Sequence, residues 1–106
     1  MGKQQWKEGT VQEFLDLSDA DMAVVETKVA LTRVLRGKRQ SAGLTQTEVA
    51  RTMRTSQSRV ARIEAGDPAV SLDLVFKALY AVGMTPRDVG VSIQETAVPY
   101  HLSGGN

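Results

Sequence analysis

The sequence predicts an all-α fold, a compact bundle of about five helices that leaves room for one short C-terminal strand. Three observations lead to this fold class. Apolar residues recur at helical spacing, hydroxyl residues suited to N-caps stand in front of these segments, and the connections are short. The sequence lacks the alternation of strands and helices that is typical of α/β folds. Its 106 residues suffice for one hydrophobic core.

The first and longest helix is expected from Asp19 to about Arg39. Ser18 precedes it as an N-cap, and acidic residues occupy the first turn, where the helix dipole favours negative charge. Basic residues complement the dipole at the other end. Gly43 then suits the left-handed conformation that commonly ends a helix.

Two short helices are expected next, from Gln46 to about Met53 and from Gln57 to about Ala65. Thr45 and Glu48 have the spacing of a capping box, in which each side chain bonds the backbone amide of the other residue. Ser56 is the N-cap candidate of the second short helix.

A fourth helix is expected from Leu72 to about Val82, with Ser71 as its N-cap. Residues 85–86 can open one more helical turn, since proline is favoured at the first helical position. Apolar residues alternate with Gly and Ser over residues 89–93, which predicts a short strand. Residues 103–106 are expected to be disordered.

These elements divide the chain into three segments. Residues 1–17 form a polar N-terminal arm in which the role of Trp6 stays open. Residues 18–88 form the helical domain. Residues 89–106 form an extension with the strand, a candidate dimerisation element, and the tail.

The net charge is only +1, but the basic residues are concentrated in the middle of the chain. Residues 31–66 hold eight basic and two acidic residues, a net charge of +6, whereas residues 1–30 carry −3 and residues 67–106 carry −2. Seven of the eight basic residues are arginine, whose planar guanidinium suits phosphates and guanine edges. The cluster indicates either a nucleic-acid-binding surface or a solvated helix face.

The composition argues against an enzyme. There is no cysteine, and the single histidine, His101, lies in a glycine-rich tail, which excludes disulfides, thiolate sites and a histidine metal cluster. We expect no enzymatic activity, no cofactor and no small-molecule ligand. No apolar run reaches the roughly 18 residues of a membrane span, and the N-terminus lacks the apolar stretch of a signal peptide, so a soluble cytoplasmic protein is expected.

The two short helices are separated by about three residues, which is the geometry of a helix-turn-helix. In this motif the second helix places its N-terminal side chains against base edges in the major groove. Gln57 and Ser58 lie in the first turn of that helix, and Arg62 follows one turn later, so these three residues are the candidate base readers. Gln46 and Ser56 are placed for contacts with DNA phosphates.

Residues 44–50 and 56–66 resemble the Xre/Cro-type helix-turn-helix family of phage repressors and bacterial regulators, and the similarity extends over about residues 31–83. The resemblance implies a lambda-repressor-like fold in which Gln46 contacts a phosphate and Arg59 lies near the DNA backbone. It also implies base reading by the three candidates above, and a structural ion pair between Arg39 and Glu64.

The sequence departs from the family pattern at the turn, where Gly and Val are usual and Arg54-Thr55 stands here. A residue other than glycine in a left-handed turn costs roughly 1 kcal/mol. Either the turn is rebuilt, or Arg54 accepts this strain and gains a phosphate contact. Arg51 is a further candidate for a weak phosphate contact.

The resulting hypothesis is a transcriptional repressor that binds a palindromic operator as a homodimer, because one small module neutralises too few phosphates for tight binding. Residues 89–93 are expected to pair across the two-fold axis, with the N-terminal arm as the alternative dimer surface.

The acidic segment over residues 13–26 and the shortness of the chain are similar to HigA-type antitoxins. This resemblance implies a RelE-like toxin as the partner. The other interpretation is that the acidic residues only stabilise the first helix. The rival function is a protein-interaction adaptor that keeps the fold without reading DNA.

Overall fold

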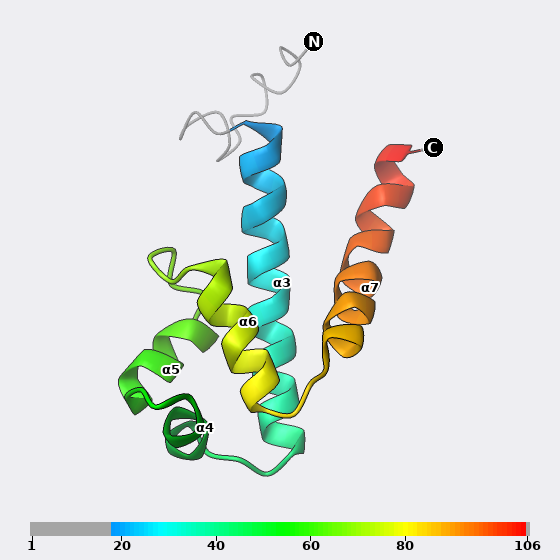
Figure 1. The fold of residues 1–106 in the computed structure, drawn as a ribbon. Coiled ribbons are helices and arrows are strands. Elements are labelled where there is room, and N and C mark those ends of the chain that lie inside the picture. Colours follow the sequence, from blue (N-terminus) through cyan, green and yellow to red (C-terminus); the bar gives the residue numbers. More distant parts are fainter. Residues whose placement is uncertain (1–17, 106) are drawn as a thin grey trace.

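The computed structural model describes residues 18–105, with side chains described as far as Glu95. Five helices follow one another, and no strand occurs within these residues (Figure 1). They are α3 (Asp19–Ser41), α4 (Gln46–Met53), α5 (Gln57–Glu64), α6 (Leu72–Ala81) and α7 (Pro86–Gly105). The prediction of an all-α bundle is confirmed over this range. The N-terminal arm, with Trp6, and Asn106 lie outside the described residues.

The predicted N-caps begin the helices. The hydroxyl groups of Ser18, Thr45, Ser56 and Ser71 each accept a hydrogen bond from the backbone amide three residues later. Each cap satisfies an amide that the helix itself leaves without a partner. The helix starts are therefore encoded locally, by single hydroxyl residues.

The core lies where the C-terminal half of α3 meets the other helices. Leu31 and Leu35 of α3 are fully buried, together with Ile63 of α5 and Leu79 of α6. Burial of each such side chain contributes about 1.5–3 kcal/mol to the free energy of folding. α3 thus serves as the support against which α5, α6 and α7 pack.

The N-terminal half of α3 is packed much less closely than the C-terminal half. Val24, Val25 and Val29 are exposed, although their spacing is helical and amphipathic. In Figure 1 this half of α3 and the C-terminal half of α7 extend to the same end of the molecule, far from α4 and α5. The bundle therefore has a compact end, which holds the two short helices, and an open end.

The prediction of a strand over residues 89–93 is wrong, because these residues belong to α7. Thr85 and Asp88 form a capping box that starts this helix: the Thr85 amide donates to Asp88 Oδ2 at 2.9 Å, and the Asp88 amide donates to Thr85 Oγ1 at 3.1 Å. Val89 is buried and Ile93 is half-buried against the core, whereas Val91 is exposed. Val89 and Ile93 are four residues apart, and residues at this spacing lie on one face of a helix as well as on one face of a strand. The apolar alternation therefore does not distinguish the two structures.

The same helix also contains the rest of the described C-terminal segment. Residues 103–105, predicted to be a disordered tail, lie within α7. The boundary expected at residue 88 falls inside α7, which packs along α3 as part of the bundle. None of the helices described here has the length and apolar character needed to cross a membrane.

Candidate nucleic-acid interface

The helices α4 and α5 pack against each other at the compact end of the bundle (Figure 1). Val49 and Ala50 of α4 are buried, as are Val60 and Ile63 of α5. Each helix has eight residues and a strongly one-sided apolar face, so the opposite face of α5 is left to solvent. The predicted pair of short helices is present with the predicted starts.

The turn between them contains a left-handed arginine. Arg54 has φ 60° and ψ 47°, and it is the one residue other than glycine with positive φ in the described chain. The Thr55 amide donates to the Ala50 carbonyl at 2.9 Å, so the turn keeps its hydrogen bonds. The sequence left open whether the turn has another geometry or keeps the usual one with a strained Arg54. The structure shows the second: the turn is kept, and Arg54 adopts the left-handed conformation.

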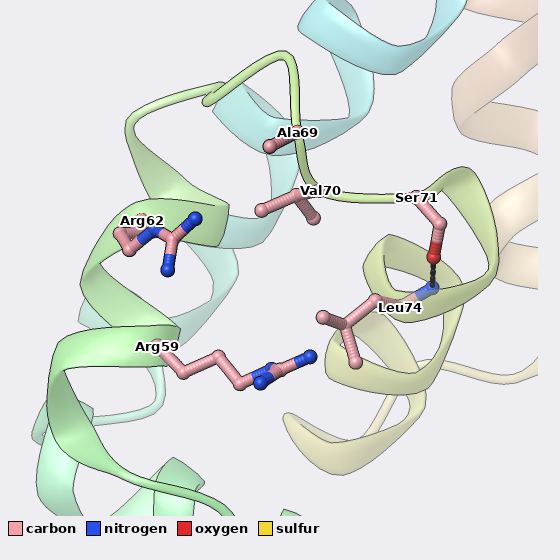
Figure 2. Close-up of a pocket in the computed structure, with 6 residues that line it drawn as sticks. All are labelled: Arg59, Arg62, Ala69, Val70, Ser71 and Leu74. Atoms are coloured by element: carbon pink, nitrogen blue, oxygen red, sulfur yellow. Dashed lines mark hydrogen bonds between the residues drawn. The ribbon is translucent and has the colours of Figure 1, made fainter.

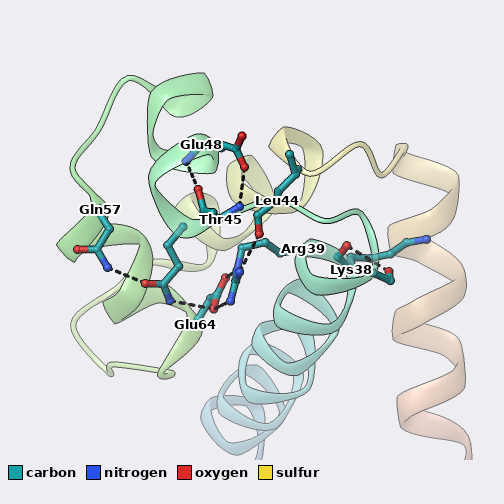
Figure 3. A network of polar contacts seen from close by, with 9 residues as sticks. Lys38, Arg39, Leu44, Thr45, Glu48, Gln57 and Glu64 are labelled. Atoms are coloured by element: carbon teal, nitrogen blue, oxygen red, sulfur yellow. Dashed lines mark hydrogen bonds and ion pairs between the residues drawn. The ribbon is translucent and has the colours of Figure 1, made fainter.

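A buried ion pair anchors the C-terminal end of α5 to α3 (Figure 3). Arg39 Nε lies 2.5 Å from Glu64 Oε2, and Arg39 Nη2 donates to Glu64 Oε1 at 3.1 Å. Arg39 Nη1 also donates to the Leu44 carbonyl at 2.9 Å, which ties the loop before α4 to the same group. This is the structural pair that the family resemblance implied.

The same carboxylate fixes the side chain of Gln46. Gln46 Nε2 donates to Glu64 Oε1 at 3.1 Å. Because a carboxylate facing an arginine only accepts hydrogen bonds, Gln46 must turn its NH₂ group toward Glu64 and its carbonyl oxygen outward. Gln46 is half-buried, so its orientation is set by the protein rather than by solvent.

Gln46 in turn orients Gln57, the first residue of α5 (Figure 3). Gln57 Nε2 donates to Gln46 Oε1 at 2.6 Å. This leaves Gln57 with a carbonyl oxygen and one N–H for an external partner. An acceptor and a donor on one amide are what N6 and N7 of adenine require in the major groove.

The other two candidate base readers lie on the same exposed face of α5. Ser58 is exposed, and its Oγ lies 3.2 Å from Oγ of Ser56. Arg62 is also exposed, and its Nε donates to Asp67 Oδ2 at 2.9 Å. The pKa of Asp67 is lowered, first by the hydrogen bond from the Ala69 amide and then by Arg62.

The side chain of Arg59 extends from α5 toward Leu74 of α6 (Figure 2). The guanidinium groups of Arg59 and Arg62 face a hollow of about 140 Å³ between α5, the following loop and the start of α6. Ser71 and Leu74 complete its wall. The guanidinium of Arg59 beside this hollow suits a phosphate oxygen of a DNA backbone.

The two remaining candidates for phosphate contacts, Arg51 and Arg54, are exposed at the end of α4 and in the turn. Within the part of the chain that the structure describes, neither forms an ion pair. In these residues no three His, Asp or Glu side chains converge in a way that could hold a metal ion.

Comparison with protein families gives one match, to the family described as helix-turn-helix domain, over residues 30–90. The match covers more than half of the chain. The protein belongs to the helix-turn-helix domain family. The matched region begins within α3 and ends just after the start of α7, so it contains the whole buried network and the exposed face of α5. Comparisons with curated proteins and with solved structures gave no match.

Sequence reasoning missed two contacts of this helix-turn-helix. It assigned Gln46 to a phosphate and Gln57 to a base, without the bond that joins them. The available signal was that each glutamine is the first residue of its helix, directly after a hydroxyl cap. It also gave no role to Asp67, whose position depends on how the chain turns after α5.

Proposed function

We propose that this helix-turn-helix protein is a sequence-specific DNA-binding transcriptional regulator that acts as a repressor in the cytoplasm. The observation that carries the proposal is the exposed face of α5. There the exposed Gln57 is held by the chain Arg39–Glu64–Gln46, and its carbonyl oxygen turns away from that chain (Figure 3). A side chain that is ordered before binding loses less entropy when it meets a base.

The operator is expected to be palindromic and the protein to bind it as a homodimer. One module of this size buries little surface on DNA, whereas two copies double both the base contacts and the neutralised phosphates. Two recognition helices bound on one face of B-DNA are about 34 Å apart, which is one helical turn. The half-sites should therefore be separated by about 10 base pairs between their centres.

Selection of bound sequences from random DNA, followed by a salt titration of the best sequence, tests this function. The expected result is a two-fold symmetric motif whose affinity falls steeply with salt, by about 0.9 in logarithmic slope for each phosphate contacted. Enrichment of no sequence would contradict the proposal. Absence of any DNA binding would favour the adaptor, the rival function with the same fold.

An antitoxin role is a narrower proposal. It is supported by the resemblance to HigA-type antitoxins and by the exposed acidic side chains Asp19, Asp21 and Glu26 in the N-terminal half of α3. An acidic surface suits a basic partner such as a RelE-like toxin. Co-expression with the product of the adjacent reading frame should give a complex that survives gel filtration. A neighbouring gene that encodes no small basic protein would contradict this role.

A further inference from the structure

We propose that Asp67 is a positioning residue that holds the guanidinium of Arg62 ready for guanine and away from phosphates. This inference rests on the proposed function, because it assigns a specificity role within the same DNA-reading surface. The contact that suggests it is the bond from Arg62 Nε to Asp67 Oδ2, at 2.9 Å.

The end of α5 brings the two residues together. Gly66 adopts the left-handed conformation with φ 75°, and its amide donates to the Ile63 carbonyl at 3.1 Å. The Asp67 amide then donates to the Arg62 carbonyl at 3.2 Å. These two bonds define a Schellman motif, in which the residue after the glycine returns over the last turn of the helix. That residue usually makes an apolar contact, and here an ion pair takes its place.

The Asp67 carboxylate is itself held in place. Its Oδ1 accepts a hydrogen bond from the Ala69 amide at 2.9 Å, and Lys28 of α3 donates to the Pro68 carbonyl at 3.1 Å. The loop is thus fastened both to its own backbone and to the long helix. The lowered pKa of Asp67 keeps its carboxylate charged at neutral pH.

The bond at Nε determines what Arg62 has left to offer. With Nε occupied, the two terminal nitrogens of the guanidinium remain as a parallel pair of donors. Guanine presents two acceptors, O6 and N7, in the major groove, whereas adenine presents one acceptor and one donor. The arrangement therefore favours guanine at the base pair that Arg62 meets.

Without Asp67, Arg62 would have a different set of partners. A free arginine on a DNA-binding surface can turn to the phosphates, which are the same in every sequence. Removal of the carboxylate also deletes a negative charge that repels DNA. Loss of Asp67 should therefore strengthen binding to all DNA while weakening discrimination.

The test compares the affinity for the selected operator with that for a variant in which one G·C pair in each half-site is changed to A·T. This G·C pair is identified with the Arg62→Ala protein, as the pair whose replacement no longer changes the affinity of that variant for DNA. Asp67→Asn keeps an oxygen for the Ala69 amide and removes the acceptor for Arg62. Asp73→Asn is the matched control, because Asp73 is exposed, lies 3.9 Å from Lys77 and carries the same charge.

We expect Asp67→Asn to lower the discrimination ratio about two- to fivefold, which corresponds to the worth of an exposed ion pair. Asp73→Asn should leave the ratio unchanged, and Asp67→Asn should have no effect on the ratio when Arg62 is already alanine. An unchanged or increased ratio in Asp67→Asn would overturn the proposal, as would an Arg62→Ala protein that discriminates at every base pair as the parent does.

A measurement without DNA separates this proposal from the proposed function. In the NMR spectrum of the free protein, the Arg62 Nε–H signal should be resolved and protected from exchange with water. It should move to the position of free arginine in Asp67→Asn and stay in place in Asp73→Asn. An averaged signal in the parent protein would overturn the positioning role even if the operator is bound with full specificity.

Discussion

Two arginine–carboxylate pairs lie at the C-terminal end of α5, and they differ in their exposure to solvent. At the inner side, Arg39 and Glu64 have side chains that are 13% and 4% exposed. At the outer side, Arg62 and Asp67 have side chains that are 56% and 30% exposed. The same chemical pair thus occurs once inside the bundle and once on the surface proposed to meet DNA.

The difference shows how burial assigns a role to an ion pair. A buried charge without its partner has lost its hydration, so the inner pair must stay intact for the fold to be stable. An exposed pair gains little because water competes for both charges. The outer pair is therefore free to serve orientation, and Arg62 can exchange water for a base without unfolding the domain.

The largest effect is expected from Arg39→Met. This change leaves the buried Glu64 carboxylate without its cation, and it should lower the free energy of unfolding by about 3–5 kcal/mol. Urea denaturation followed by circular dichroism measures the loss. Lys77→Met is the matched control, since it breaks an exposed pair and should cost less than about 0.5 kcal/mol. Equal losses in the two variants would remove the contrast between inner and outer pairs.

Arg62→Ala should have a large effect on DNA binding and a small one on stability. We expect the affinity for the selected operator to fall by about 1–3 kcal/mol, with a relaxed preference at one base pair of each half-site. Unfolding should change by less than about 1 kcal/mol, because the pair with Asp67 is exposed. Fluorescence anisotropy with the operator and with random DNA gives both affinities. Equal losses on the two DNAs would show that Arg62 contacts phosphates and reads no base.

Gln46→Leu tests the link from the buried network to the surface. The sequence alone predicts the loss of one phosphate contact, which would weaken operator and random DNA alike. The bond from Gln57 to Gln46 adds the loss of an oriented base reader. We therefore expect a loss of about 1–2 kcal/mol on the operator and about 0.5–1 kcal/mol on random DNA. A loss of the same size on both DNAs would leave Gln46 with the phosphate role only.

Arg54→Gly is expected to have the smallest effect, and it acts in opposite directions on fold and binding. Glycine removes the left-handed strain at φ 60°, which should raise the free energy of unfolding by about 0.5–1 kcal/mol. The lost cation should reduce the salt slope of DNA binding by about 1 per subunit. Arg51→Ala loses the same charge within a helix and should not gain stability. A less stable Arg54→Gly protein would show that the arginine makes a stabilising contact in the turn.

The helix starts were predictable because each depends on a hydroxyl residue and the few residues that follow it. The two short helices and the Arg39–Glu64 pair were likewise accessible from local caps and family pattern. α7 was not, since Val89 and Ile93 satisfy both a two-residue and a four-residue repeat, and only packing against α3 decides between them.

The orientation of the site was less predictable than its residues. The sequence places Gln46, Gln57 and Arg62 on suitable helices. Their partners, however, are 11 or 18 residues away in the sequence, or lie in a turn that depends on Gly66. A chain of three side chains, which begins with Arg39 on α3, determines which amide atoms Gln57 presents to DNA. Such chains form only in the packed structure, and sequence spacing does not reveal them.

The most direct test of the account is an NMR titration of the labelled protein with its selected operator. We expect the largest amide shifts over residues 56–62 and at Gln46, with small shifts in the N-terminal half of α3. Shifts centred on the open end of the bundle, around Val24 and Val25, with α5 unchanged, would contradict it.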